Sequence, residues 1–199
     1  MKNVCFLFGI NGVGKSTVAG HVISMVKGSV RLSSSEVLRR AFGDVSRDEL
    51  ERMPAYVKRD ALRVALTEAF TAHQRASLVV CEMHLVACIR RNGVVSRERM
   101  WHDSFLRHAR AYCLISSPKE AVLRRRDHDI RATGRVRSLD SSGIHEDAIT
   151  NEAEFRQLFS GKENAFIARN NGTVAQTARV IVERSAKKNV HDVLMDTAG

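Results

Sequence analysis

Short, wholly apolar runs alternate along the chain with longer stretches of mixed apolar and polar residues. The wholly apolar runs lie at residues 4–8, 78–81 and 111–115; the run at residues 165–169 is apolar up to Arg169, and a weaker one lies at residues 29–33. Runs that are apolar at every position are typical of strands covered on both faces, as in a parallel sheet. Strands that alternate with helices predict an α/β fold with right-handed crossovers. We therefore expect a parallel sheet of about five strands flanked by helices in a three-layer arrangement.

The stretches between these runs carry helical signals. The expected helices span residues 15–27, 34–41 (with Ser34 or Ser35 as its cap), 48–74, 118–129, 144–159 and 173–187. Pro54 is expected to break or restart the third of these helices near its beginning, because proline removes a backbone donor and clashes with the preceding turn. The chain shows no internal repeat. We interpret residues 1–189 as one domain and residues 190–199 as a weakly ordered C-terminal tail.

The first apolar run leads directly into a glycine-rich segment. Residues 9–16 read Gly-Ile-Asn-Gly-Val-Gly-Lys-Ser, which matches G-x-x-x-x-G-K-[ST], and this segment opens the first expected helix. Such a loop turns its backbone N–H groups toward a phosphate, and the helix N-terminus adds partial positive charge. Lys15 can reach the outer phosphates, and the Ser16 hydroxyl can ligate Mg²⁺. The residues expected to hold ATP here are Gly9, Asn11, Gly12, Val13, Gly14, Lys15, Ser16 and Thr17.

Composition narrows the class of protein. The chain has 199 residues, of which 44% are hydrophobic, enough for one domain with a real core. No apolar stretch approaches the roughly 20 residues of a membrane span. The four scattered cysteines (Cys5, Cys81, Cys88 and Cys113) are best interpreted as free thiols in a reducing compartment, most of them buried. A cytoplasmic protein without membrane association is expected.

The net charge of +10 admits two interpretations, nucleic-acid binding or the convergence of arginines on phosphorylated substrates. The arginines gather in one short stretch, at Arg124, Arg125, Arg126, Arg131, Arg135 and Arg137. This stretch lacks the aromatic residues that interleave with basic ones on single-strand binding surfaces. The local cluster therefore favours phosphate chemistry over a long nucleic-acid groove, and nucleic acid stays a possible but less favoured partner.

Beyond the phosphate loop, several segments together resemble the nucleoside monophosphate kinases, in particular the archaeal-type adenylate kinases. The resemblance spans about residues 1–185 and is carried by residues 32–39, 80–84, 120–126, 135–140 and 170–174. It implies the P-loop NTPase fold, with a monophosphate-binding segment at about residues 30–75 and a short lid at about residues 127–143.

The resemblance also implies roles for single residues. Ser34 would approach the acceptor base, and Arg39 would pair with the monophosphate. Glu82 and His84 stand where the family carries Asp-x-His at a strand end, with Glu82 joining Ser16 on Mg²⁺. Arg125, Arg135 and Arg137 would come to the phosphates with the lid. Asn171, in the last strand-to-helix turn, would lie at the adenine. Three departures stand out: Glu82 replaces the aspartate, the stretch between Arg126 and Arg135 is longer than the family's, and residues 89–110 match nothing in the family.

The expected reaction is transfer of the γ-phosphoryl group of ATP to a nucleoside monophosphate, with AMP as the first candidate. An already ionised monophosphate needs no general base, whereas a hydroxyl acceptor requires one, such as Glu82. The alternatives are thus a P-loop kinase that phosphorylates a hydroxyl of a small molecule or of a nucleic-acid end, or a nucleic-acid-associated ATPase. The sequence predicts no oligomeric state.

Overall fold

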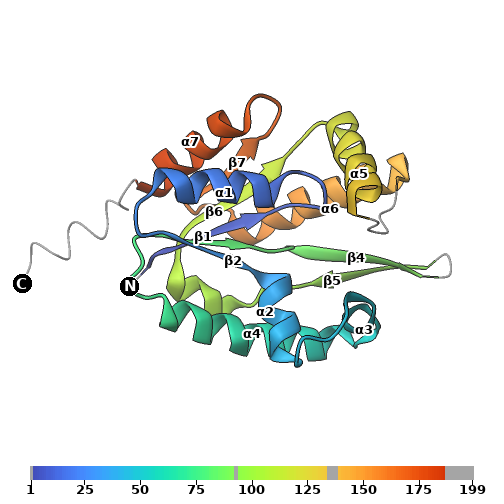
Figure 1. Cartoon of the computed structure of the whole chain (residues 1–199), viewed down its shortest axis with the longest axis horizontal. Coiled ribbons are helices and arrows are strands. Elements are labelled where there is room, and N and C mark those ends of the chain that lie inside the picture. Colours follow the sequence, from blue (N-terminus) through green and yellow to red (C-terminus); the bar gives the residue numbers. More distant parts are fainter. Residues whose placement is uncertain (1, 92–93, 134–138, 187–199) are drawn as a thin grey trace, which may run out of the picture.

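The computed structural model describes residues 2–91, 94–133 and 139–186, and its centre is a five-stranded sheet (Figure 1). The strands pair in parallel throughout this sheet. Their spatial order is β2 (Val30–Ser33), β3 (Val79–Glu82), β1 (Val4–Phe8), β6 (Ala109–Ser116) and β7 (Ala165–Arg169). The predicted α/β class with a five-stranded parallel sheet is confirmed. The chain passes from β1 toward the β2 edge and later toward the β7 edge, so the carboxyl end of β1 lies where the strand order reverses.

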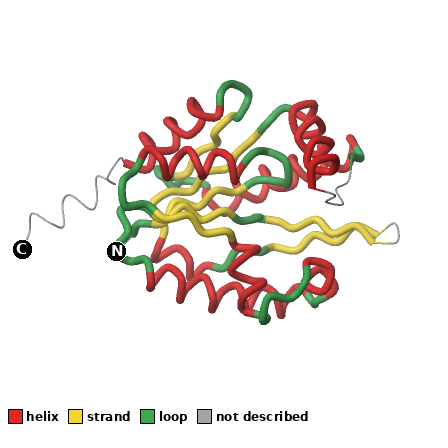
Figure 2. The backbone as a smooth tube through the Cα atoms, viewed as in Figure 1, coloured by secondary structure: helices red, strands yellow, loops and turns green. Residues whose placement is uncertain are grey.

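Helices cover both faces of the sheet (Figure 2). Successive residues of a strand point to opposite faces, so β1 supplies two separate cores. Phe6 and Phe8 join the cluster that includes residues of α4, whereas Cys5 and Leu7 join the cluster that includes residues of α1 and α7. The helices of these two layers are α1 (Lys15–Met25) and α7 (Val174–Ala186) on one face, and α4 (Ala55–Ala72) with the short 3₁₀ helix η1 (Asp103–His108) on the other. Burial on both faces explains why β1 is apolar at every position.

One long helix belongs to both cores. Ile144, near the start of α6 (Ser141–Phe159), packs in the α1-side cluster, whereas Phe155 and Phe159 pack in the α4-side cluster. The side chain of Asp140 caps this helix by accepting hydrogen bonds from the N–H groups of Ser142 and Gly143. The helix therefore passes from one layer to the other, and it contacts β6 on its way.

The segment expected as one helical region over residues 48–74 forms two helices. α3 (Arg47–Arg52) ends just before Pro54, which occupies the N-cap position of α4. The predicted break at Pro54 is thus observed. α2 (Ser34–Ala41) ends where expected but starts one or two residues early, because its N-cap is Ser33 and not Ser34 or Ser35. α5 (Lys119–Thr133) extends past residue 129, so that residues 127–133 of the expected lid segment are helical. Residues 134–138 of that segment and the tail at 190–199 lie outside the described residues.

A second, two-stranded sheet fills the region that matched nothing in the sequence analysis. β4 (Val86–Arg91) and β5 (Val94–Arg99) pair antiparallel and continue away from the carboxyl end of the main sheet (Figure 1). The backbone of Val86 exchanges two hydrogen bonds with the Asn151 side chain, at 3.2 and 3.3 Å. The only advance signal was Asn-Gly at 92–93, a dipeptide favoured in two-residue hairpin turns.

Three of the four cysteines, Cys5, Cys81 and Cys113, are fully buried, and all four are free thiols, as expected. Burial is the main cause that raises the pKa of the Cys5 thiol, to about 11, so this group stays protonated at neutral pH. Trp101 is 4% exposed and packs edge-on against Phe6, which makes it a core residue. In the part of the chain that the structure describes, no helix combines the length and apolar character needed to cross a membrane.

Candidate phosphate-binding site at the carboxyl edge of the sheet

The phosphate loop connects β1 to α1 in a conformation that needs glycine. Gly9 and Gly14 have φ angles of +146° and +94°, which L side chains rarely adopt. A Cβ atom on Gly14 would meet Asn170 Nδ2 at 2.6 Å, and one on Gly9 would meet the Ile115 carbonyl oxygen at 2.8 Å. The loop is therefore packed closely against the ends of β6 and β7, so only glycine fits at these two positions.

Side chains hold the carbonyl groups of this loop one after another. Lys15 Nζ donates to the carbonyl oxygens of Gly9, at 2.6 Å, and Ile10, at 3.0 Å. The Asn11 carbonyl accepts from Arg126 Nε at 3.1 Å. In a trans peptide the C=O and the following N–H point in opposite directions. Each carbonyl held by a side chain therefore turns the N–H of the same peptide away from that side chain, and N–H groups of this kind are what a phosphate nest uses.

The Val13 carbonyl is the most heavily bonded of the series. It accepts from Asn170 Nδ2 at 2.8 Å, from Arg125 Nη1 at 3.1 Å and from Ser117 Oγ at 3.3 Å. Asn170 is 1% exposed and sits in the turn after β7. Residues just after β6 and β7 and one from the middle of α5 thus converge on one peptide group and fix the loop on the strands.

Two arginines of α5 contact the phosphate loop, and the sequence predicted only one of them as a site residue. Arg125, expected on the ATP phosphates, lies beside the loop, where it also donates to Ser117 Oγ at 3.0 Å. Burial, and secondly the neighbouring Arg124, lower the pKa of its guanidinium. Arg126 was not predicted as a site residue, yet it is 5% exposed and holds the Asn11 carbonyl. Its spacing of four from the buried Val122 was the available signal, because such residues share one helix face.

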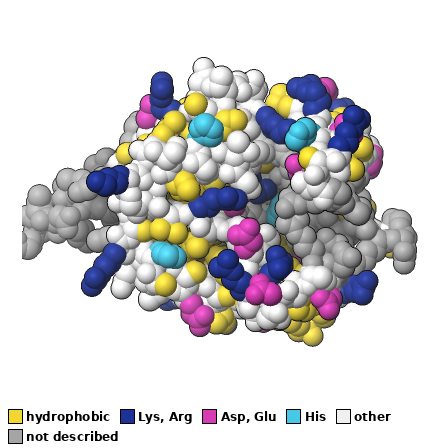
Figure 3. All heavy atoms as spheres, viewed as in Figure 1, with side chains coloured by type: hydrophobic (Ala, Val, Ile, Leu, Met, Phe, Trp, Pro, Cys, Tyr) yellow, Lys and Arg dark blue, Asp and Glu magenta, His cyan; other side chains and the backbone are white. Residues whose placement is uncertain are grey.

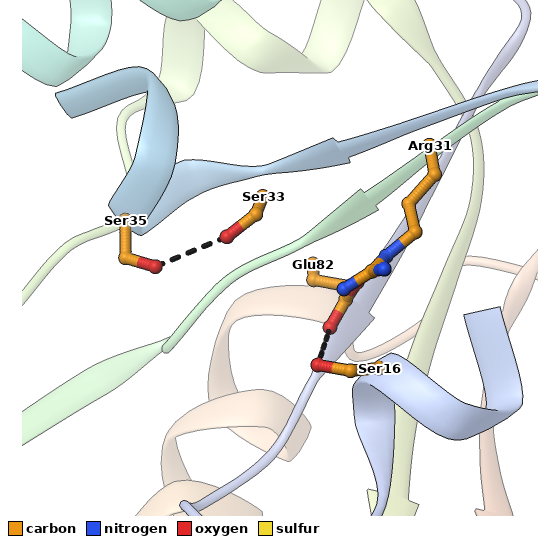
Figure 4. Close-up of polar contacts among 5 residues, drawn as sticks. All are labelled: Ser16, Arg31, Ser33, Ser35 and Glu82. Carbon is orange, nitrogen blue, oxygen red and sulfur yellow. Dashed lines mark hydrogen bonds and ion pairs between the residues drawn. The ribbon is translucent and has the colours of Figure 1, made fainter. Parts of the chain in front are cut away.

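A carboxylate lies beside the loop on the opposite side of β1 (Figure 4). Glu82, at the end of β3, is 5% exposed, and its Oε2 accepts from Ser16 Oγ at 2.6 Å. Its Oε1 accepts from Nε of Arg31, with which it forms an ion pair. The structure thus brings together the two residues expected on Mg²⁺. The sequence did not predict Arg31 as a site residue, because a single arginine in a weakly predicted strand belongs to no motif or periodic pattern.

The expected substrate residues lie along the same edge but are less closely connected. Ser34 is buried at the start of α2, and its neighbours Ser33 and Ser35 are 3.0 Å apart through their hydroxyl oxygens (Figure 4). Arg39 donates to the Val45 carbonyl at 3.0 Å and lies 3.8 Å from the Asp44 carboxylate. Its guanidinium is thus held by the turn after its own helix.

The remaining predicted residues can be placed briefly. His84 is half-buried two residues after β3, and Thr17 is exposed in the first turn of α1. Asn171, predicted near adenine, is exposed in the turn after β7. The residue before it, Asn170, is the one that contacts the phosphate loop. Arg135 and Arg137 lie outside the described residues, so their role stays a prediction.

A cavity of about 90 Å³ lies next to the first half of the phosphate loop. Gly9 and Ile10 of the loop line it together with the carboxyl end of β6, and α6 contributes His145 and Glu152. It shows that the space between the loop and α6 is not filled by side chains.

Comparison with solved structures identifies the fold. A shikimate kinase from Acinetobacter baumannii, in complex with shikimate, matches with a TM-score of 0.62 at 17% identity, over 100% of this chain and 97% of that one. A gluconokinase from Sinorhizobium meliloti 1021 matches with a TM-score of 0.54 at 14% identity, over 99% and 98% of the two chains. A tunicamycin resistance protein from Deinococcus radiodurans matches with a TM-score of 0.53 at 16% identity, over 94% and 98%. No curated protein sequence matches the chain.

The sequence also matches a protein-family model. The model, described as an AAA domain, matches residues 4–149, which is more than half of the chain and includes the phosphate loop, Arg31, Glu82 and the arginines of α5. The chain therefore belongs to this AAA domain family, and it has the P-loop kinase fold.

Proposed function

We propose that the protein is an ATP-dependent kinase that transfers the γ-phosphoryl group to a hydroxyl of a small polar molecule. The observation that carries the proposal is Glu82, a buried carboxylate hydrogen-bonded to the hydroxyl that ends the phosphate-loop motif. A hydroxyl acceptor has to lose its proton during transfer, and a carboxylate beside the transferring group can take it. The fold supports the proposal, because solved structures with the same fold are titled shikimate kinase and gluconokinase.

The donor nucleotide is assigned to the phosphate loop. Backbone N–H groups from Gly9 to Thr17 would surround the β- and γ-phosphates, and Lys15 would turn from the loop carbonyls to the outer phosphates. The residues present also fit a magnesium ion, which Ser16 Oγ would ligate directly and Glu82 Oε2, 2.6 Å from that hydroxyl, would hold through a bound water. When bound, the ion would neutralise charge on the phosphates.

On the acceptor side this chain supplies hydroxyls and one carboxylate. Ser33 and Ser35 present hydroxyl groups at the end of β2, next to the end of β3 that carries Glu82. Hydroxyl side chains donate and accept hydrogen bonds with alcohols and carboxylates alike. They therefore suit a polyhydroxylated acceptor, which Glu82 would deprotonate while the loop holds ATP in line with it.

A nucleoside monophosphate, AMP above all, remains the second candidate acceptor. Its support is the resemblance of residues 32–39 to a monophosphate-binding segment, with Arg39 as the phosphate ligand. The contacts of Arg39 with Asp44 and the Val45 carbonyl weigh against it, because a phosphate would have to displace both. On the face drawn in Figure 3, several basic side chains lie next to acidic ones, and others gather over α5.

The test is a screen of acceptors with ATP and Mg²⁺ that measures ADP formation. The panel contains polyols and hydroxy acids, the nucleoside monophosphates, and an oligonucleotide with a 5′-hydroxyl, each with the wild type and the Lys15→Ala variant. We expect Lys15-dependent ADP formation with at least one hydroxy compound. Turnover with a nucleoside monophosphate alone would replace the proposal by the second candidate.

The role of Glu82 is tested on the acceptor that the screen identifies. Glu82→Gln keeps the size of the side chain and removes its basicity, so kcat should fall by about 100-fold or more, the usual contribution of a general base. Glu68→Gln on the exposed side of α4 is the matched control and should leave kcat unchanged. A Glu82→Gln enzyme with wild-type kcat on a hydroxyl acceptor would refute the assignment of the base.

A further inference from the structure

The contact between Arg31 and Glu82 has no role in the reaction as described so far. Arg31 lies in β2, the edge strand, and its side chain is 38% exposed, whereas that of Glu82 is 6% exposed. Its Nε donates to Oε1 of Glu82, and Ser16 Oγ donates to Oε2 (Figure 4). Each oxygen of the carboxylate therefore has its own donor, one from the edge strand and one from the phosphate loop.

The register of the sheet makes this contact possible. In the parallel pairing of β2 with β3, Arg31 lies opposite Val80 and Ser33 lies opposite Glu82. Arg31 and Glu82 are thus diagonal neighbours on one face of the sheet, a distance that a long side chain spans. Val80 belongs to the core cluster that includes residues of α1. Arg31 and Glu82 therefore lie on the face of the sheet that α1 covers, and Ser16 is in the first turn of that helix. The edge strand is thereby linked to the phosphate loop through one carboxylate.

The physical consequence is a carboxylate that is both neutralised and fixed in direction. A buried carboxylate without a cation is costly, and one held by a single hydrogen bond can rotate. We propose that Arg31 is a positioning residue for phosphoryl transfer: it holds Oε1 of Glu82 so that Oε2 alone is directed to Ser16 and the reacting groups. This inference rests on the proposed kinase function, in which Glu82 acts on the acceptor.

The charge of Arg31 adds a consequence for nucleotide binding that does not require an acceptor. Without the guanidinium, Glu82 adds an uncompensated negative charge beside the phosphate loop, which repels the phosphates of a metal-free nucleotide. A divalent cation bound with the nucleotide offsets that repulsion. The benefit of Mg²⁺ for nucleotide binding should therefore increase when Arg31 is removed.

The experiment compares Arg31→Met and Arg31→Lys with Arg179→Met, a control on the exposed side of α7 near the opposite edge of the sheet. With the identified acceptor, Arg31→Met should lower kcat at least about tenfold, while the KM for ATP changes less than about threefold. Arg31→Lys should restore part of the loss, because it returns the charge without the guanidinium geometry. In a Glu82→Gln background, Arg31→Met should change kcat less than about twofold, since residues that act through one another are not additive.

The acceptor-independent arm measures binding of a non-hydrolysable ATP analogue by calorimetry, with and without Mg²⁺. The ratio of the two affinities should rise at least about threefold in Arg31→Met and stay unchanged in Arg179→Met. Unchanged kcat and an unchanged ratio in a folded Arg31→Met variant would overturn the inference, as would an equal loss of kcat in the Glu82→Gln background. If the screen finds no acceptor, the kinase proposal fails, while this ratio still shows whether Arg31 offsets the charge of Glu82 beside the phosphate loop. If Arg31→Met does not fold, Arg31→Gln, which also removes the charge, is used for both arms.

Discussion

Two regions at the carboxyl edge of the sheet are held in place by different kinds of bonds. Around the phosphate loop, side-chain donors bind backbone carbonyls, as Lys15 binds those of Gly9 and Ile10 and as Arg126 binds that of Asn11. Around the β4–β5 hairpin, apart from the two bonds between Asn151 and the Val86 backbone, side chains bind side chains of opposite charge. These pairs join Lys58 with Glu98 at 3.1 Å, Arg97 with Glu146 at 4.0 Å, and Arg99 with Glu154.

The difference matters for function because one kind of bond fixes the path of the backbone and the other fixes the positions of whole helices and strands. Hydrogen bonds to carbonyls fix the path of the backbone itself, which is what a phosphate nest of N–H groups requires. Ion pairs between α4, the hairpin and α6 fix whole elements relative to one another and leave the backbone between them free to vary. In the proposed kinase, the loop side would hold the donor nucleotide.

The largest effect is expected from Lys15→Ala on the loop side. Loss of its ammonium should lower kcat/KM by about 100- to 1000-fold, the range for removing one group that stabilises transferring charge. Stability should change little, because Lys15 is only partly buried; Lys27→Ala, at an exposed site, is the control. Steady-state ADP formation and thermal unfolding are the measurements. Near wild-type turnover in Lys15→Ala would remove the catalytic assignment of the loop.

On the hairpin side, the sharpest change is Lys58→Met. The Lys58 and Glu98 side chains are 7% and 17% exposed, so removing the cation leaves a largely buried carboxylate unpaired. We expect a loss of about 2 to 3 kcal/mol in the free energy of unfolding. Lys58→Met/Glu98→Gln should recover most of it, and Lys162→Met at an exposed site should cost almost nothing. Denaturant unfolding measures all three, and equal losses in the single and double variants would show that the ion pair is not the cause.

A smaller and more specific effect is expected from Arg126→Met. The substitution keeps the buried stem of the side chain and removes the donor to the Asn11 carbonyl, so the affinity for ATP should fall about tenfold. Arg124→Met, on the exposed side of the same helix, is the matched control. Calorimetry with a non-hydrolysable ATP analogue makes the comparison. Unchanged affinity would show that the loop keeps its shape without this bond, and the contrast between the two regions would weaken.

The smallest effect is expected from Arg39→Ala, which separates the two candidate acceptors. If the acceptor is a hydroxy compound, its KM should change less than about twofold, and stability should fall by less than about 1 kcal/mol because the ion pair with Asp44 is exposed. If Arg39 binds a monophosphate, the loss of a charge-assisted partner should instead weaken acceptor binding by about 2 to 4 kcal/mol. The KM values of the acceptor and of ATP decide between these outcomes.

The sequence by itself determined the donor half of the protein. The glycines of residues 9–16 permit the one backbone path that surrounds a phosphate, and the apolar run before them places that loop at a strand end. The parallel sheet, the break at Pro54 and the burial of the cysteines also followed from local patterns. Local patterns suffice here because the information for a turn, a strand or a helix end lies within a few neighbouring residues.

The tertiary structure alone decided which charged residues meet. Arg31 lies 51 positions before Glu82, and Arg126 lies 115 positions after Asn11, so no periodicity links them. Lys58 and Glu98 became partners only once a hairpin, absent from the expected elements, was placed between α4 and α6. A charged side chain in a sequence is solvated by default. Whether it is instead buried against a carboxylate or a carbonyl depends on strand order and register, which arise from packing across the whole domain.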